Sequence, residues 1–208
     1  MKNNIAIIGT GATGSSLVRD IFYMFKNRKD PPHLFLYDRD LVEERNTRYT
    51  IYKTKDIDEP KVEVLKKRYE HKIPTAAFAE EYLKQEFLGD SIIVSCVDTM
   101  RARKDIWFQT AYKQPEKVRY FFDCRAGWDV YRVYAINPRL SEERQLYEES
   151  LYSDEEVKIE PCSMRNKECF SANAKKAAEE IKLFLKTGKV NQREFIFDLK
   201  FNEIILAR

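Results

Sequence analysis

The sequence predicts an α/β protein with a doubly wound, Rossmann-like, mostly parallel sheet that ends in a crossover loop, a helix and a late strand. Two observations lead to this prediction. Short apolar runs alternate along the chain with segments whose apolar residues follow helical spacing, which is typical of β-α-β units with parallel strands. The first of these units also carries a glycine-rich turn, Gly9-Thr-Gly-Ala-Thr-Gly14, between its strand and its helix.

The first β-α-β unit lies at the start of the chain. Residues 5–8 form an apolar run that stops at Gly9, and the spacing of apolar residues predicts a helix over 15–26. The polar segment 27–32 contains two prolines, which must end that helix before a second strand over 34–37. The two strands should therefore be parallel.

The alternation then continues. The pattern predicts a helix over 61–69, a buried strand over 91–97, a helix over 100–112 and strands over 118–122 and 131–136. Residues 140–167 are acidic and irregular, which favours a mobile crossover or lid, and an amphipathic helix then leads to Gly188 and a late strand over 195–199. We therefore predict a single domain over 1–208 with a crossover or lid loop at 140–170.

Composition excludes several classes of protein. The 37 basic and 34 acidic residues nearly cancel, so no long-range field for nucleic-acid binding is expected. No apolar run approaches the roughly 20 residues that span a bilayer, and no signal-peptide pattern opens the chain, so we expect a cytoplasmic protein without membrane partners. The four cysteines form no CxxC pair, so no structural zinc is expected.

The glycine turn and the end of the second strand predict a nucleotide site. The small residues Gly9, Gly11, Ala12 and Gly14 let backbone N–H groups approach a phosphate at the positive end of a helix. Asp38 ends the second strand, where a carboxylate can accept hydrogen bonds from the ribose hydroxyls. These residues alone fit NAD, FAD, ATP or S-adenosylmethionine, or a tight turn with no ligand.

The segment from Asp38 to Arg48, followed by Glu59-Pro60-Lys61, separates these possibilities, because an oxidoreductase has no reason to collect Arg48 and Lys61 here. In this segment the chain resembles the ThiF/MoeB/HesA family, the adenylating domain shared with ubiquitin-activating enzymes. That family has a D-x-D-x-V-x-x-x-N-x-x-R signature, a lysine that opens the next helix, and a later D-N-x-x-x-R element. The matching residues here are Asp38, Asp40, Val42, Asn46, Lys61, Asp98 and Arg103. The resemblance covers roughly the first two thirds of the chain.

The resemblance implies an enzyme that uses ATP and Mg²⁺ to adenylylate a carboxylate, with or without later transfer to a thiol or amine. The substrate would be the free C-terminus of a ubiquitin-like protein, a sulfur-carrier protein or a peptide, and the enzyme would be a homodimer. The residues that it assigns to the nucleotide are Asp38 for the ribose, Asn46, Arg48 and Lys61 towards the phosphates, Asp98 for Mg²⁺, and Asp40 as a further nucleotide-binding residue. Adenylylation needs such cations, since charge builds up on the triphosphate as pyrophosphate leaves.

Departures from the family pattern keep two other interpretations open. The chain is one residue short before Arg48, which makes Arg45 an alternative, and Thr99 replaces an asparagine. An arginine that relatives supply from an N-terminal segment of the partner subunit is expected to be missing or to come from another place. These differences favour a catalytically silent binding subunit. A nicotinamide oxidoreductase is supported only by the glycine turn and Asp38. Arg103 is expected to anchor structure and not to contact ATP.

Cys162 completes the candidate catalytic set of Arg48, Lys61, Asp98 and Cys162. In relatives a cysteine of the crossover region takes the acyl group as a thioester or becomes a persulfide partner. Thiolates are nucleophilic near neutral pH, especially beside cations such as Arg165 and Lys167. Packing is the alternative role for Cys162 and for Cys169, and it is the expected role for Cys96 and Cys124.

Overall fold

A computed structural model describes residues 3–80, 89–153 and 166–208 of the chain. The strands are β1 (Asn4–Ile8), β2 (His33–Tyr37), β3 (Thr75–Phe78), β4 (Ser91–Ser95), β5 (Val118–Ala126), β6 (Val130–Ile136), β7 (Glu194–Asp198) and β8 (Glu203–Ala207). The longer helices are α1 (Ala12–Phe25), α2 (Lys61–Tyr69), α3 (Met100–Trp107), α4 (Ser141–Glu148) and α5 (Lys167–Thr187). Short helical turns are η1 (Glu44–Arg48), η2 (Thr54–Asp56), η4 (Phe108–Tyr112) and η5 (Pro115–Lys117).

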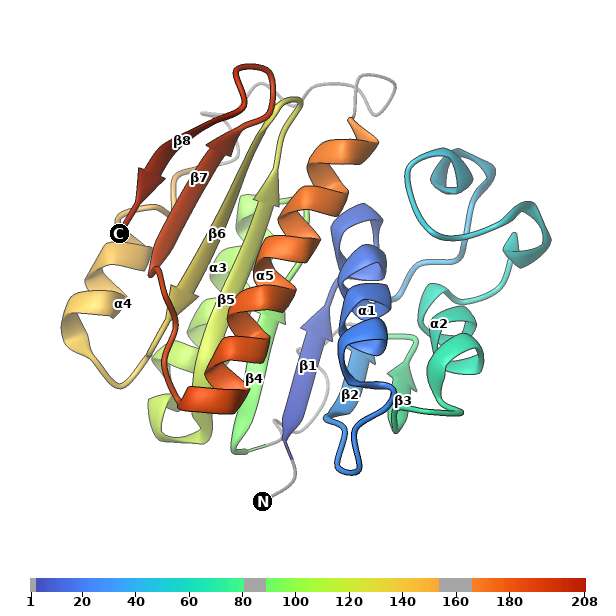
Figure 1. Cartoon of the computed structure of the whole chain (residues 1–208), viewed down its shortest axis with the longest axis horizontal. Coiled ribbons are helices and arrows are strands. Elements are labelled where there is room, and N and C mark those ends of the chain that lie inside the picture. Colours follow the sequence, from blue (N-terminus) through green and yellow to red (C-terminus); the bar gives the residue numbers. More distant parts are fainter. Residues whose placement is uncertain (1–2, 81–88, 154–165) are drawn as a thin grey trace.

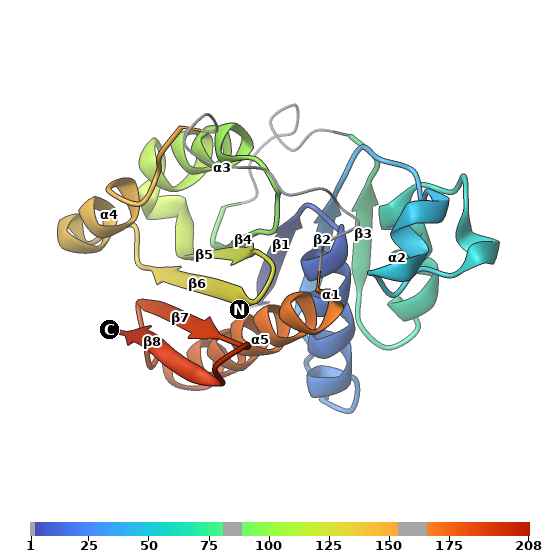
Figure 2. The ribbon, with the colours of Figure 1, turned by 90° about the horizontal axis from the view of Figure 1, so that it is seen from above.

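The strands form one sheet in the order β3-β2-β1-β4-β5-β6-β7-β8. Strands β1 to β5 pair in parallel, and β6, β7 and β8 add antiparallel strands at one side. Helices cover both faces: α1, α2 and α5 lie on one, and α3 and α4 lie on the other (Figures 1 and 2). The predicted α/β doubly wound, mostly parallel sheet is confirmed.

The alternation of side chains explains this layering. Ile5 and Ile7 of β1 belong to the core beneath α1 and α5, whereas Ala6 and Ile8 belong to the core beneath α3. A strand that is buried on both faces reads as a continuous apolar run, which is the pattern of a central parallel strand.

The sequence located most elements and missed three. The predicted helix over 61–69 has the observed bounds, and Gly188 ends α5 with φ of 73° as expected. The short strand β3 and the edge strand β8 were not predicted. The stretch 140–167 was expected to be irregular, but α4 lies within it because Glu143 and Tyr147 form a buried face. The α-helix predicted over 100–112 ends at Trp107 and continues as a π-helical turn.

The order of strands places the candidate residues at one edge of the sheet. Ile8 is paired with Tyr37 of β2 and with Ser95 of β4, so the chain leaves all three strands at the same level. The backbone N–H of Gly9 donates to Tyr37 (2.9 Å), and that of Cys96 donates to Ile8 (2.8 Å). Because β2 and β4 flank β1 on opposite sides, this edge is the switch point at which open α/β sheets bind ligands.

Candidate functional site

Close packing of backbone explains two of the three glycines in the turn. Gly9 has φ of 85°, and a Cβ on it would lie 2.9 Å from the carbonyl oxygen of Cys96. A Cβ on Gly14 would lie 1.9 Å from the carbonyl oxygen of Gly9. The protein itself therefore requires glycine at both positions.

Gly11 differs, because no described atom outside its two chain neighbours lies within 4 Å of the Cβ that it lacks. It stands immediately before α1, whose first turn contains no acidic residue. The first N–H groups of a helix have no partner within the helix and carry a partial positive charge. The turn thus presents the N–H groups of the first helical turn next to Gly11. No contact within the described chain explains why residue 11 is a glycine.

Asp38 holds this turn in place. One carboxylate oxygen, Oδ2, accepts hydrogen bonds from the backbone N–H of Thr10 (2.7 Å) and from its hydroxyl (3.0 Å), and Oδ1 accepts one from the backbone N–H of Asp40 (2.9 Å). A carboxylate has about four acceptor positions, so roughly one is left. Asp38 has a structural role that the sequence did not predict, and it has room for one ribose hydroxyl where two were expected.

Lys61 opens α2 in a nearly enclosed position. Its side chain is 8% exposed, and its Nζ lies 2.8 Å from Oδ2 of Asp40, whose side chain is 55% exposed. A cation at a helix N-terminus is opposed by the helix dipole, so the contact with Asp40 offsets an unfavourable placement. The lysine charge therefore depends on a carboxylate that faces water.

Tyr52 joins Lys61 to the glycine turn. Its hydroxyl donates to the carbonyl oxygen of Thr10 (2.8 Å) and lies 3.3 Å from the carbonyl oxygen of Lys61. No sequence pattern predicted a role for Tyr52, because that role depends on how the segment between η1 and η2 folds back.

The turn η1 carries Asn46 and Arg48. The side-chain oxygen of Asn46 accepts the backbone N–H of Glu43 (2.9 Å) and so caps η1. Arg48 is exposed, and the described residues show no contact between its side chain and the glycine turn, Asp38 or Lys61. Arg45, the alternative, pairs with Glu43. The phosphate roles of Asn46 and Arg48 remain predictions.

Asp98 is exposed just beyond β4, at the same edge as the glycine turn. The next residue, Thr99, caps α3 by accepting the backbone N–H of Ala102 on its hydroxyl (3.2 Å). Threonine therefore caps the helix here, as the asparagine of the family pattern could also do. No group of three or more metal-binding side chains occurs among the described residues. A single carboxylate is still compatible with Mg²⁺, which takes one or two carboxylates together with phosphates.

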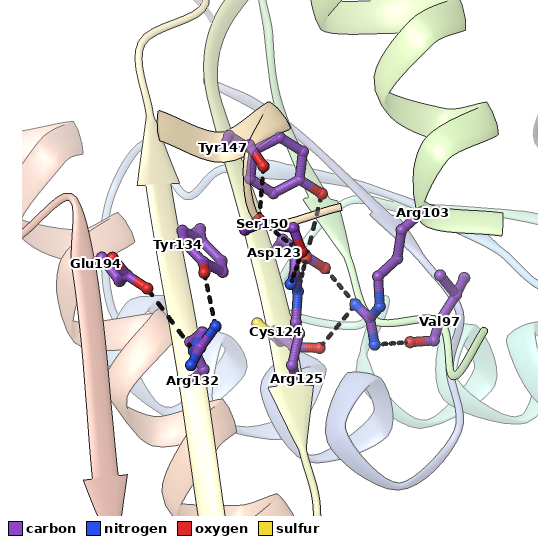
Figure 3. Close-up of polar contacts among 10 residues, drawn as sticks. All are labelled: Val97, Arg103, Asp123, Cys124, Arg125, Arg132, Tyr134, Tyr147, Ser150 and Glu194. Carbon is purple, nitrogen blue, oxygen red and sulfur yellow. Dashed lines mark hydrogen bonds and ion pairs between the residues drawn. The ribbon is translucent and has the colours of Figure 1, made fainter. Parts of the chain in front are cut away.

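A buried ionic cluster supports the segment that carries Asp98 (Figure 3). Arg103 donates to the carbonyl oxygen of Val97, to the carboxylate of Asp123 and to the carbonyl oxygen of Cys124 (3.3 Å). Arg125 donates to the other oxygen of Asp123 (2.6 Å). The expectation that Arg103 anchors structure is confirmed.

The charge balance of this cluster fixes the ionisation of Asp123, which is 0% exposed. Burial alone would raise its pKa, but Arg103 and Arg125, with a hydrogen bond from Tyr147 (3.2 Å), outweigh that effect and hold the pKa below its usual value. Asp123 is therefore ionised, and it balances two arginines that would otherwise be buried without a counter-ion.

The described cysteines are packing residues. Burial, with the nearby charge of Asp129, raises the pKa of the Cys169 thiol to about 12. The pKa of Cys124 is also raised, first by a hydrogen bond with Cys96 and then by burial. Neither thiol is a thiolate near neutral pH, so Cys169 is a poor candidate nucleophile. Cys162 lies outside the described residues.

Fold and site together define a doubly wound Rossmann-like domain with a glycine-rich turn at its switch point. The model of the ThiF family matches residues 1–118. The chain belongs to the ThiF family. No curated protein matches the sequence significantly. Among the described residues, no helix combines the length and apolar character needed to cross a bilayer.

Solved structures share the fold at low sequence identity. PaaA is 19% identical with a TM-score of 0.70, and the alignment covers 97% of this chain and 62% of PaaA. E. coli MccB is 15% identical with a TM-score of 0.72, covering 97% of this chain and 61% of MccB. MccB with AMPCPP and MccA is 16% identical with a TM-score of 0.70, covering 99% and 63%. The chain therefore spans about three fifths of the length of these proteins.

Proposed function

We propose that this protein is a ThiF-like adenylyltransferase that transfers AMP from ATP to the C-terminal carboxylate of a small protein or peptide. The observation that carries the proposal is Lys61, a nearly enclosed lysine that Tyr52 links to the glycine turn. Membership of the ThiF family supports an adenylyltransferase-type role. The proposal extends that role to a particular set of side chains.

The residues at this edge of the sheet fit ATP. The space at Gly11 and the free N–H groups at the start of α1 suit a phosphate, and Asp38 keeps an acceptor for a ribose hydroxyl. Lys61 supplies the positive charge that this glycine turn lacks. Asp98 would hold Mg²⁺, which shields the charge of the phosphates when bound.

The reaction would join a carboxylate oxygen to the α-phosphorus and break the bond to pyrophosphate. Lys61 would stabilise the charge that develops on the departing oxygens, after its ammonium moves from Asp40 to the phosphates. Arg48 is the candidate for a second cation, and Asn46 for a further phosphate contact. Cys162 is the candidate acceptor should the acyl group pass to sulfur.

The partner would be a peptide or small protein with a free C-terminus. The similar structures include MccB with MccA, which supports a peptide-sized substrate. We also propose a homodimer, and light scattering that shows only monomers would contradict this part.

ATP–pyrophosphate exchange tests the activity. Synthetic peptides with free C-terminal carboxylates should support exchange, and the same peptides as C-terminal amides should not. Exchange should fall at least about 100-fold in Lys61→Ala and in Asp98→Ala, since electrostatic contacts to the transition state have effects of this order. Lys72→Ala, at an exposed position beyond α2, is the control and should match the wild type. Equal exchange in all these variants would refute the assigned roles.

The alternative is a binding subunit that holds ATP without reacting. The contact between Lys61 and Asp40, together with the exposed Arg48, favours it. Calorimetry with Mg-ATP separates the two proposals: tight binding without exchange under any peptide condition supports the silent subunit, and exchange rules it out.

A further inference from the structure

We infer that Tyr52 is a positioning residue that sets Lys61 against the phosphate turn. This inference rests on the proposed function, because it concerns the geometry of the same nucleotide site. Tyr52 is 3% exposed, and its hydroxyl has one proton to share between the carbonyl oxygens of Thr10 (2.8 Å) and Lys61 (3.3 Å). The shorter distance gives Thr10 the larger share.

The backbone around Tyr52 is anchored on two sides. Its backbone N–H donates to the hydroxyl of Thr50 (3.2 Å), which itself donates to the carbonyl oxygen of Asn46 (2.6 Å). On the preceding residue, the carbonyl oxygen of Ile51 accepts from Arg68 of α2 (2.8 Å). Tyr52 is therefore tied to η1 on one side and to α2 on the other.

Two features make the hydroxyl the important part of this side chain. Burial raises the pKa of Tyr52 far above its ordinary value, so the group remains a hydrogen-bond donor. The other route from the turn to Lys61 runs through Asp38 and Asp40. There the backbone N–H of Lys61 donates to the carbonyl oxygen of Asp40 (3.1 Å), and Nζ contacts the Asp40 carboxylate, which is 55% exposed. The buried hydroxyl of Tyr52 therefore adds a direct link between the turn and the start of α2 that does not pass through Asp40 and does not compete with water.

Tyr52 acts on the backbone of Lys61, so its effect on the nucleotide should pass through the lysine side chain. Removing the hydroxyl leaves the contacts of Lys61 with Asp40 as the remaining link of the start of α2 to the turn, so the helix can shift. Small displacements of a charged group in a site have large effects on binding and rate. Tyr52→Phe keeps the ring and removes only the hydroxyl. Tyr120→Phe is the matched control: Tyr120 is also buried, and it lies near the start of β5, at the end of the sheet away from the turn.

A double-mutant cycle read by calorimetry with Mg-ATP tests the inference. Tyr52→Phe should weaken ATP about fivefold to tenfold, Tyr120→Phe less than about twofold, and Lys61→Ala at least about tenfold. In the Lys61→Ala background, Tyr52→Phe should add less than about twofold. A loss of stability alone would not give this pattern, because the titration measures folded protein and a stability defect does not depend on Lys61.

The outcomes separate this inference from the proposed function. Wild-type protein that binds ATP while Tyr52→Phe binds it equally well would overturn the role of Tyr52 and leave the proposed function intact. Losses that multiply in the double mutant would show that Tyr52 acts independently of Lys61, which also overturns the inference. Wild-type protein that binds no ATP would remove the proposed function and this inference together.

Discussion

Alanine at Gly14 should lower the stability of the protein, whereas alanine at Gly11 should weaken nucleotide binding and leave stability nearly unchanged. In Gly14→Ala the new Cβ would lie 1.9 Å from the carbonyl oxygen of Gly9, where carbon and oxygen normally approach no closer than about 3.3 Å. The turn between β1 and α1 must then move by more than about 1 Å. Cys96 gives little room, since its Cβ lies only 3.2 Å from the same position. Overpacking of this severity costs about 3 kcal/mol or more of unfolding free energy.

Gly11→Ala meets no such obstacle, because no described atom outside its two chain neighbours lies within 4 Å of the new methyl. Its unfolding free energy should fall by only about 1 kcal/mol, the typical cost of placing alanine at a helix N-cap. Its affinity for Mg-ATP should nevertheless fall about tenfold or more, since the methyl enters the space assigned to the phosphates. Urea unfolding followed by fluorescence gives the first quantity and calorimetry gives the second. Gly14→Ala within 1 kcal/mol of the wild type, or Gly11→Ala with unchanged ATP affinity, would refute this reasoning.

Two further predictions concern the aspartates. Asp38 has room for about one more hydrogen bond, so it can bind one of the two ribose hydroxyls of ATP. In a competition assay, one of the two analogues 2′-deoxy-ATP and 3′-deoxy-ATP should bind about tenfold more weakly than ATP, and the other should bind within about twofold of ATP. Equally large losses of affinity for both analogues would contradict this prediction. Asp123→Asn should lower the unfolding free energy by about 3–5 kcal/mol, because Arg103 and Arg125 stay buried without a counter-ion. The pKa of Asp123 is lower in the folded state than in the unfolded state. The ionised carboxylate therefore stabilises the fold at pH values above the unfolded-state pKa of about 3.9, and this stabilisation is lost as the pH falls below that value. Acid titration of stability should therefore be flatter in the variant below about pH 4, and parallel curves would be the contrary result.

The sequence predicted the fold because its central elements are governed by local pattern. Strand β1 is apolar on both faces, and α2 begins at Lys61 after a proline, so strand and helix could be located from spacing alone. Edge elements lack that signal. The exposed strand β8 forms because it pairs with β7. Helix α4 lies in an acidic segment, and only its packing against α3 and β6 shows which of its residues are buried.

The site divides in the same way. Each of three candidate groups follows the end of a strand: the glycines of the turn, Asp38 and Asp98. Parallel pairing of β1, β2 and β4 brings these strand ends together, so the common location of the three groups could be predicted. The hydrogen bonds of Thr10 and Tyr52 could not, because they depend on how a long connection folds back over the turn. Nor does residue type show that Asp123 faces two arginines, since that cluster joins β5 to α3.

The position of Lys61 relative to a bound nucleotide tests the central claim most directly. A crystal structure with Mg²⁺ and a non-hydrolysable ATP analogue should place the triphosphate over Gly11, with the Nζ of Lys61 within about 3 Å of a phosphate oxygen, the usual length of such a hydrogen bond. Mg²⁺ should lie on Asp98. A nucleotide bound elsewhere, or one that leaves the ammonium of Lys61 on Asp40 and Asp98 without metal, would contradict the account.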